Sequence, residues 1–442
     1  MRTLSFLSAK AVRGLLVHAT WACLVIASAA RAGQQAVTDD PNTKAMAAYR
    51  YLHEHPELGH EEFLAHSYIK QALTDHGFAE FVESIKAPTA VIAVLHAPRR
   101  GPVIALRAEL DARSLDNGEA EPLDHDPRSV IPGKMHNCGH DLHAATLLGA
   151  ALELKKQLRS LRGTFIFVFQ PAEETKGGAD EIVDEGILQR LGVQAVFAQH
   201  SVPGMAVGTE GISSGTPLAG SAYFTLRIGG RGSHVAAPYE GDDLAATTSR
   251  LAQALTDWPA RHLDIANHPA VISLTRIHAD SGQAGSLPTQ AEIKGSLRAF
   301  ENPWQSAEGA SLKDRIEGFV GGLAAANGVT LDWEWQRGSP PTINDAALFD
   351  EMIPSLQRQW HGKLATTYYR GMFSEDFSYY TPAIRSLYFS LGIAKDRLGV
   401  GAVHTTRFTV HPEAVSEGVA FLVLLAKTAS NALDSYKPAA VK

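Results

Sequence analysis

Cysteine is scarce in this sequence of 442 residues, which contains only Cys23 and Cys138. We expect the segment around Cys23 to be removed, so Cys138 is left as the single thiol and an internal disulfide is excluded. In an oxidising compartment a lone thiol is vulnerable unless it is buried or bound to a metal. Because Cys138 lies among polar residues and histidines, metal binding explains it better than burial in an apolar core.

Long apolar runs are also scarce, since the sequence has one, from Leu15 to Ala30, with three basic residues ahead of it. The sequence Ala30-Arg31-Ala32 then offers a small-x-small cleavage site, which completes the pattern of a secretory signal peptide over residues 1–32. A permanent membrane anchor is the less favoured alternative, because the run is short for a bilayer and His18 interrupts it. We therefore expect an exported protein, periplasmic or secreted, that has no membrane attachment after cleavage.

Excess positive charge, low-complexity tracts and internal repeats are absent as well. The formal charge is −7, and it becomes −11 once residues 1–32 are removed, because that segment carries four basic and no acidic side chains. A chain this negative has no reason to bind nucleic acid or an anionic membrane. A content of 45% hydrophobic and 20% charged residues is typical of a globular protein, and the length predicts two domains.

From about residue 40 onward, helical patterns alternate with short apolar runs. The run at residues 165–169 is continuously apolar, as in a strand that is buried on both faces of a parallel sheet. Alternation of strands and helices predicts a mainly parallel α/β sheet. The other expected strands of this sheet lie at residues 90–95, 103–106, 195–198 and 387–391.

The hydrophobic period changes after Gly215, where apolar and polar residues begin to alternate. Four such segments and two helical ones follow in β-α-β-β-α-β order, which is that of a ferredoxin-like module. We expect this module, residues 216–338, to be inserted into a catalytic domain formed by residues 39–215 and 339–434. The expected elements lie at residues 222–228, 242–255, 271–277, 291–297, 311–325 and 329–335.

Polar side chains follow three of the expected parallel strands at the point where each strand ends. Asp111 follows residues 103–106, the pair Glu173 and Glu174 follows residues 165–170, and His200 follows residues 195–199. Ligands gather at the carboxyl ends of strands in open parallel sheets, so these side chains are expected to lie close together.

The loop Met135–His143 lies between the first two of these strands and holds one thiol, three imidazoles and a carboxylate. These are the side chains that bind zinc and its first-row neighbours, although the loop could instead be a polar helix entry with Asp141 as its cap. In a metallohydrolase one carboxylate of a pair such as Glu173 and Glu174 holds metal and the other takes a proton from water. A solvated acidic pair is the alternative, and His200 or His404 taken alone would more often be structural.

Several separate motifs, in one order, resemble those of the aminoacylase-like metallopeptidase and amidohydrolase family. The nearest branch contains hippurate hydrolases, N-acyl-amino-acid deacylases and indole-acetyl-amino-acid hydrolases. The similarity extends from about residue 40 to 430. The motifs are Arg107–Ala112, Met135–His143, Gln170–Glu174, His200, Gly230–Pro238, Ser374–Phe377 and His404–Phe408.

The resemblance implies a role for each matching residue. Glu173 would be the general base, and Asp111 would orient a metal ligand. Cys138 would occupy a position where more distant relatives have a bridging aspartate. The pair of divalent ions, zinc or manganese, would be bound by Cys138, His140, Glu174, His200 and His404.

In the family the smaller domain mediates dimerisation, which implies a homodimer. His234 would reach the partner's active site and help to hold the developing oxyanion, while Arg298 would bind the free carboxylate of the substrate. Gly230–Pro238 could instead be a turn-rich connection, and Arg298 an exposed strand residue. Ser374-Glu375-Asp376 is better explained as a helix N-cap followed by acidic residues of the first turn.

The sequence departs from the family pattern at Arg113-Ser114, where Leu-Pro is usual, and at Ser233, which replaces a glycine. The first departure lies near the expected substrate entrance and puts substrate preference in doubt. We expect a metal-dependent amidohydrolase that cleaves hippurate-like N-acyl amino acids to a carboxylic acid and an amino acid. A dipeptidase or carboxypeptidase with the same two-metal site is one alternative, and a non-catalytic metal- or ligand-binding protein is another.

Overall fold

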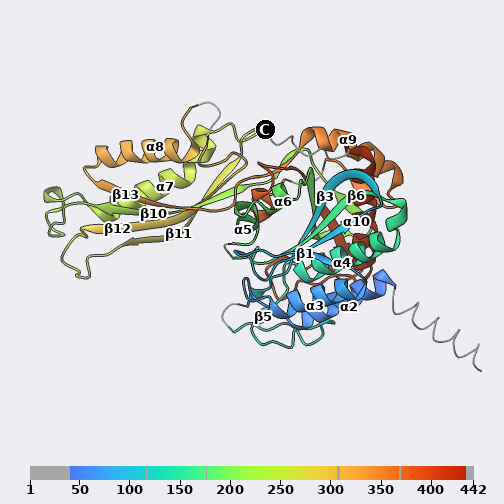
Figure 1. Ribbon diagram of the computed structural model, residues 1–442. Coiled ribbons are helices and arrows are strands. Elements are labelled where there is room, and N and C mark those ends of the chain that lie inside the picture. Colours follow the sequence, from blue (N-terminus) through green and yellow to red (C-terminus); the bar gives the residue numbers. More distant parts are fainter. Residues whose placement is uncertain (1–39, 116–117, 176, 306–308, 368–369, 435–442) are drawn as a thin grey trace, which may run out of the picture.

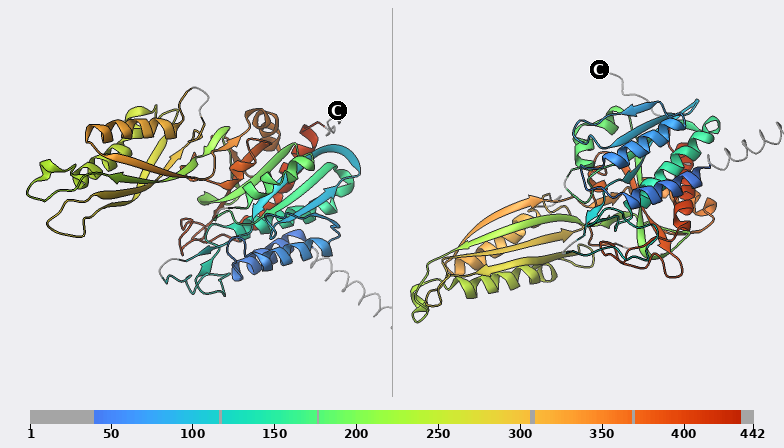
Figure 2. Two further views of the ribbon diagram at one scale, coloured as in Figure 1. Left: turned by 60° about the vertical axis from the view of Figure 1, so that its left-hand side comes forward. Right: turned by 90° about the horizontal axis from the view of Figure 1, so that it is seen from below.

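The computed structural model describes residues 40–115, 118–175, 177–305, 309–367 and 370–434 (Figure 1). The predicted signal peptide, residues 1–32, lies outside these ranges. The described chain forms a larger domain and a smaller one, which both views of Figure 2 show as separate bodies joined by few segments. No helix in the described ranges has the length and apolar character needed to cross a membrane.

The larger domain contains an eight-stranded sheet with the order β1-β2-β6-β3-β7-β16-β8-β15. The central pairs β3·β6, β3·β7 and β7·β16 are parallel, whereas β1, β2 and the β8·β16 pair are antiparallel, which confirms a mainly parallel sheet. The strands are β1 Glu80–Val82, β2 Val91–His96, β3 Arg99–Glu109, β6 Arg162–Gln170, β7 Ala195–Ala206, β8 Thr209–Gly211, β15 Lys363–Ala365 and β16 Arg385–Ala394.

Both faces of this sheet are covered, which explains the continuous apolar run in β6. Successive side chains point to opposite faces, so Phe165, Phe167 and Phe169 enter one hydrophobic core while Ile166 and Val168 enter another. The first core includes side chains of α2 Pro41–Glu54, α3 Phe63–Asp75, α4 His140–Lys156, α9 Ala346–Gln359 and α10 Glu413–Ala432. The second includes those of α5 Ala179–Asp184 and α6 Ile187–Arg190.

The smaller domain is a four-stranded antiparallel sheet with the order β11-β12-β10-β13. Phe224, Leu226 and Ile228 alternate with more exposed residues along β10 and enter its core. Both helices lie on the same side of the sheet in Figure 1 and contribute to this core. The elements follow the predicted β-α-β-β-α-β order: β10 Gly220–Gly229, α7 Leu244–His262, β11 Ala270–Ala279, β12 Gln290–Ala299, α8 Leu312–Ala326 and β13 Thr330–Arg337.

A short two-stranded sheet lies at the junction of the domains. It pairs β9 Gly215–Leu218, which enters the smaller domain, with β14 Thr342–Asn344, which follows the return to the larger one. The entry and exit of the inserted module are therefore hydrogen-bonded to each other. The chain crosses between the domains twice at one place, as expected for an insertion.

Candidate active site

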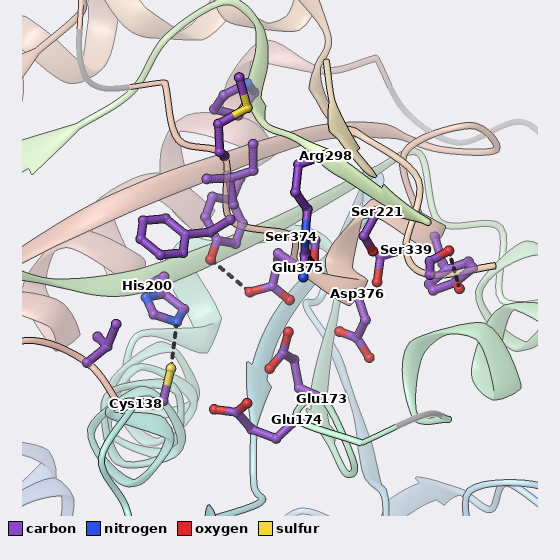
Figure 3. Close-up of a pocket in the computed structure, with 18 of the residues that line it drawn as sticks. Cys138, Glu173, Glu174, His200, Ser221, Arg298, Ser339, Ser374, Glu375 and Asp376 are labelled. Atoms are coloured by element: carbon purple, nitrogen blue, oxygen red, sulfur yellow. Dashed lines mark hydrogen bonds between the residues drawn. The ribbon is translucent and has the colours of Figure 1, made fainter. Parts of the chain in front are cut away.

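A pocket of about 1150 Å³ is lined by residues of both domains (Figure 3). From the larger domain come Cys138, Glu173, Glu174, His200 and His404, which are five of the six residues predicted to bind metal or act as the base. From the smaller domain come Ser221, Tyr223 and Arg298, near the ends of β10 and β12 where these strands approach the sheet of the larger domain.

The five predicted metal ligands are brought together. Cys138 Sγ lies 3.6 Å from His200 Nε2, and His404 Nε2 lies 3.0 Å from Glu174 Oε1. One donor atom each of Cys138, Glu174 and His404 lies within 4.8 Å of the others, and the same is true of His140, Glu173 and Glu174. Glu174 belongs to both groups, so it connects them.

The donor atoms of this cluster fit divalent metal. His140 donates its Nδ1–H to the carbonyl of Asp111 at 2.8 Å, which leaves Nε2 as the nitrogen with the free lone pair. Nε2 is buried and has no hydrogen-bond partner among the described residues. A buried imidazole nitrogen beside a thiol, two further imidazoles and a carboxylate is suited to zinc or a neighbouring first-row ion.

Burial raises the pKa of Cys138 above its ordinary value, although His140 opposes this effect. A bound divalent ion would favour the thiolate form of Cys138, which is the form that coordinates metal. His404 has a φ of 62°, in the left-handed region that residues other than glycine seldom adopt. Its backbone N–H donates to the carbonyl of Asn137 at 2.7 Å, which holds it next to the Cys138 loop.

The Cys138 loop leads into α4 at Gly139, where the backbone packs closely against Ser201. Gly139, the N-cap residue, has a φ of 93°, and a Cβ there would lie 2.4 Å from Ser201 Oγ. A larger residue would push the Cys138 loop away from the strand that carries His200. The suggestion that Asp141 caps this helix was wrong, because Asp141 lies in the first turn and binds His53.

Asp111 positions the two glutamates. Its Oδ1 accepts from the backbone N–H of Glu173 at 3.0 Å, and its Oδ2 accepts from that of Glu174 at 2.9 Å. The same carboxylate lies 3.3 Å from His140 Nδ1. One buried side chain thus fixes the turn that carries both glutamates and the ring of a predicted ligand, as the resemblance implied for its orienting role.

Glu173 is well placed to act as a base. Its Oε2 lies 3.9 Å from His140 Nε2, and its carboxylate faces those of Glu375 and Asp376. Burial, followed by the negative charges of Glu375 and Asp376, raises the pKa of Glu173 well above its ordinary value. A carboxylate of raised pKa binds a proton more readily, which suits a group that must accept one from water.

A buried network behind Glu173 was not predicted from the sequence. Arg107 is 2% exposed and contacts Glu109 and Asp376 directly, and its Nη2 lies 3.0 Å from Glu375. Gln170 accepts from Arg107 Nε at 2.8 Å. The available signal was the presence of Arg107 and Glu109 in the otherwise apolar run of residues 102–110.

Ser374-Glu375-Asp376 is therefore more than the start of a helix. The prediction that Ser374 is the N-cap was wrong, because Glu375 is the N-cap of the 3₁₀ helix η3 Asp376–Tyr379. Glu375 and Asp376 are 3% and 4% exposed and line the pocket, where their charges are balanced by Arg107 rather than by solvent. A helix-start pattern in the sequence does not reveal such a distant partner.

Other residues of the sequence motifs have definite places. His143 donates from Nδ1 to Glu109 at 2.9 Å and accepts at Nε2 from the N–H of Ser201 at 2.8 Å, so both nitrogens are engaged. His200 lies within β7 rather than after it, since the strand continues to Ala206. His136 is buried, and its Nδ1 has no hydrogen-bond partner among the described residues.

The two substrate-binding predictions differ in outcome. Arg298 is half-buried, lines the pocket and donates to Ser374 Oγ and, at 3.1 Å, to the hydroxyl of Tyr223. His234 is exposed and does not line the pocket of its own chain; its Nδ1 accepts from the N–H of Ala236. A role for His234 in catalysis requires a second chain, as the resemblance implied.

Glu62, which the sequence did not single out, supports the same turn from behind. It is fully buried, and its Oε1 accepts from the N–H of Ala172 at 2.8 Å. Ala172 has a φ of 57°, so the turn before Glu173 adopts a backbone conformation that is unfavourable for alanine. Glu62 stabilises this conformation.

Comparisons with known proteins agree with this geometry. The chain is 34% identical to the IAA-amino acid hydrolase ILR1-like 4 of Arabidopsis thaliana over 377 residues, 84% of this chain and 82% of that one. It is 30% identical to the N-acetylcysteine deacetylase of Bacillus subtilis over 385 residues, 87% of this chain and 96% of that one. A crystal structure from Bacillus subtilis, described as a dinuclear metal binding peptidase from M20 family, has a TM-score of 0.75 and 26% identity and covers 89% of this chain and 99% of its own.

The model of one protein family, described as peptidase family M20/M25/M40, matches residues 105–428. This range contains the Cys138 loop, both glutamates, His200, the smaller domain and His404. The resemblance noted in the sequence is confirmed, and the chain belongs to peptidase family M20/M25/M40, whose members are metal-dependent amidohydrolases and peptidases.

Proposed function

We propose that the protein hydrolyses the amide bond of N-acyl amino acids, such as hippurate-like compounds, to a carboxylic acid and a free amino acid. The observation that carries the proposal is the arrangement of Glu173, whose carboxylate lies 3.9 Å from His140 Nε2 in a pocket that also contains Arg298. The names of the Arabidopsis and Bacillus relatives, each of which specifies an N-acyl amino acid, support the substrate class.

In the proposed reaction Arg298 binds the free carboxylate of the amino acid, for which a guanidinium fork is suited. Two divalent ions, zinc or manganese, held by Cys138, His140, Glu174, His200 and His404, would polarise the scissile carbonyl and lower the pKa of a water toward ~7. Glu173 takes the proton from this water as the oxygen attacks the carbonyl carbon. It then returns the proton to the nitrogen as the C–N bond breaks.

We also propose that the protein is an exported homodimer. Residues 1–32 would direct export, and His234 of one chain would help to hold the oxyanion in the other. N-terminal sequencing of the protein from a periplasmic or extracellular fraction, together with sedimentation of the purified chain, tests both parts. A mature protein that begins at Met1, or a monomer with full activity, would contradict the corresponding part.

Glu173→Gln is the experiment that tests the chemistry. Losing a general base typically costs ~10²–10⁴ in rate, so kcat for an N-acyl amino acid should fall by about that factor. Metal content should stay near the wild-type value, because the five proposed ligands are unchanged. Glu83→Gln, an isosteric change at a side chain that is 67% exposed, serves as the matched control. Full activity in Glu173→Gln would show that the proposed base is wrong.

A dipeptidase or carboxypeptidase is the second candidate. The match to a peptidase family and the description of the Bacillus subtilis structure as a peptidase favour it. Its reaction needs the same base and ligands, so only the substrate differs. A panel of N-acyl amino acids and free dipeptides, compared by kcat/KM with the metal-loaded protein, separates the two candidates. A metal-loaded protein that cleaves neither group would instead favour a binding function.

A further inference from the structure

Arg113 places a cation in the pocket beside the proposed metal ligands. It lies in β4 Arg113–Ser114, which pairs with β5 Lys134–Met135, and stands opposite Met135 in that short antiparallel pair. Its Nη1 donates to Glu174 Oε2. The side chain is 33% exposed and lines the pocket, so the guanidinium faces both a carboxylate of the site and the space that a substrate would occupy.

Arg113 and Arg298 lie at opposite ends of the reactive groups. Arg298 contacts Ser374, the residue before Glu375, and the carboxylate of Glu375 faces that of Glu173. In Figure 3 Arg298 and Ser374 lie on one side of the Glu375 carboxylate, and Glu173 and Glu174 lie on the other. Since Arg113 contacts Glu174, the order across the pocket is Arg298, then the base, then Arg113.

This order divides the pocket according to the two halves of the substrate. If Arg298 binds the carboxylate of the amino acid, the scissile carbonyl lies near Glu173 and the acyl group continues toward Arg113. A neutral acyl group would leave the guanidinium with Glu174 as its one counter-charge among the described residues. Within the described part of the chain, Arg113 Nε and Nη2 make no hydrogen bond, so two or more N–H groups are available to an acceptor.

The neighbouring carboxylates do not compete for this cation. Glu375 and Asp376 are paired with the buried Arg107. Glu174, the one carboxylate on Arg113, also lies 3.0 Å from His404 and is a proposed metal ligand, so its charge is shared with the site. Arg113 thus retains positive charge that an anionic ligand can neutralise. Guanidinium binds carboxylate well because the two planar groups can form paired hydrogen bonds.

We propose that Arg113 is a specificity-determining residue that selects acyl groups with a second carboxylate at their far end. The substrates would then be N-acyl amino acids whose acyl part derives from a short dicarboxylic acid. The inference rests on the proposed function and adds the class of acyl group to it. It also gives a physical meaning to the departure of Arg113-Ser114 from the sequence pattern of the family.

The test compares two probes of nearly equal size on the same amino acid: an N-succinyl and an N-succinamoyl derivative, whose far end is a carboxylate or a neutral amide. For the metal-loaded wild type, kcat/KM should be about 10- to 100-fold higher for the N-succinyl probe, as expected for a charge-assisted contact. In Arg113→Leu this ratio should fall to about 1, and Arg113→Lys should keep part of it. Arg298→Leu should lower kcat/KM for both probes and leave the ratio unchanged.

A ratio is informative even if a variant loses part of its metal or activity, because both probes meet the same site. A second measurement needs no variant: succinate should inhibit cleavage of a neutral N-acyl amino acid more strongly than succinamate does. Cleavage of neutral N-acyl amino acids with no preference for the N-succinyl probe, or an unchanged preference in Arg113→Leu, would overturn the inference and leave the proposed function standing. Failure to cleave any N-acyl amino acid would overturn both.

Discussion

His53 is the residue whose removal should destabilise the larger domain in a strongly pH-dependent way. It is 4% exposed and donates from Nδ1 to Asp141 at 2.6 Å and from Nε2 to Glu121 at 2.9 Å. It therefore connects α2, the loop that holds Glu121 and the first turn of α4, next to the proposed ligand His140. We predict that His53→Gln weakens this connection and removes the cation that two buried carboxylates share.

The magnitude follows from the pKa of His53. Burial lowers this pKa, but the hydrogen bonds to Asp141 and Glu121 outweigh burial and raise it from 6.5 to about 9. At roughly 1.4 kcal/mol for each pKa unit, the charged form stabilises the folded state by about 3 kcal/mol. Because the folded-state pKa lies above the unfolded one, this contribution is fully present below pH 6.5 and is lost as the pH rises through 9.

The carboxylates of Glu121 and Asp141 determine the pH below which this stabilisation is lost. Their pKa values are lowered in the folded state, against the effect of burial, by the hydrogen bonds with His53. Their part of the stabilisation is present above the ordinary carboxylate pKa and is lost as the pH falls. His53, Asp141 and Glu121 together should therefore stabilise the domain most at pH values between the ordinary pKa of a carboxylate and that of histidine.

Urea unfolding at several pH values, followed by pulsed hydrogen exchange of peptides from α2 and α4, reports the larger domain separately from the smaller one. At pH 6.5 His53→Gln should lower the unfolding free energy by about 3–5 kcal/mol, the cost of breaking a buried ion pair. By pH 9.5 the difference should shrink by about 3 kcal/mol. His96→Gln, at an exposed histidine that lies 3.1 Å from Glu80, is the matched control. A difference below about 0.5 kcal/mol at pH 6.5, or one that does not change with pH, would refute the reasoning.

Four further predictions concern the metal site and the cores. Chelation should abolish activity, and added zinc or manganese should restore it. In Cys138→Ala, elemental analysis should show a loss of metal, and retention of both equivalents would remove Cys138 from the ligand set. Glu62→Ala should lower kcat without loss of metal ligands, because the turn at Ala172 loses the acceptor that stabilises it; an unchanged kcat would contradict this role. Arg107→Met should cost about 3–5 kcal/mol of stability in urea, since it leaves three buried carboxylates without their cation. Leu226→Ala should cost about 2–5 kcal/mol, measured by hydrogen exchange in the smaller domain alone.

Much of the fold could be predicted from local patterns. Residues 165–169 are apolar at every position because helices cover both faces of the sheet, and the alternation at residues 222–228 reflects a sheet covered on one face. Both patterns result from burial alone, so they are visible without knowledge of the partners. Strand ends are less visible: β7 continues through His200 to Ala206 because it pairs with β16, which lies almost two hundred residues away in the sequence.

The proximity of the predicted metal ligands could also be expected, because parallel strands carry their carboxyl ends to one edge. The buried residues that hold the ligands and the Glu173 turn in place could not be predicted in this way. Arg107 pairs with Asp376 across 269 positions, and Glu62 holds Ala172 across 110. The apolar neighbours of Arg107 indicate that it is buried, but the local sequence of neither residue identifies its partner.

Substrate preference is also hard to predict from the sequence, because it depends on contacts between residues that are distant along the chain. Glu173 and Glu174 follow the end of β6, whose apolar run can be recognised in the sequence. The role proposed for Arg113 depends on its contact with Glu174 and on its position relative to Arg298 in the pocket between the two domains. These relations exist only in the folded chain. A side chain in this position can change without affecting the strands, the turn that carries Glu173 or the cores. If the proposal holds, substitution there should alter which acyl groups are accepted, and for this reason the Arg113→Leu selectivity ratio is a more direct measure of substrate class than overall similarity to any relative.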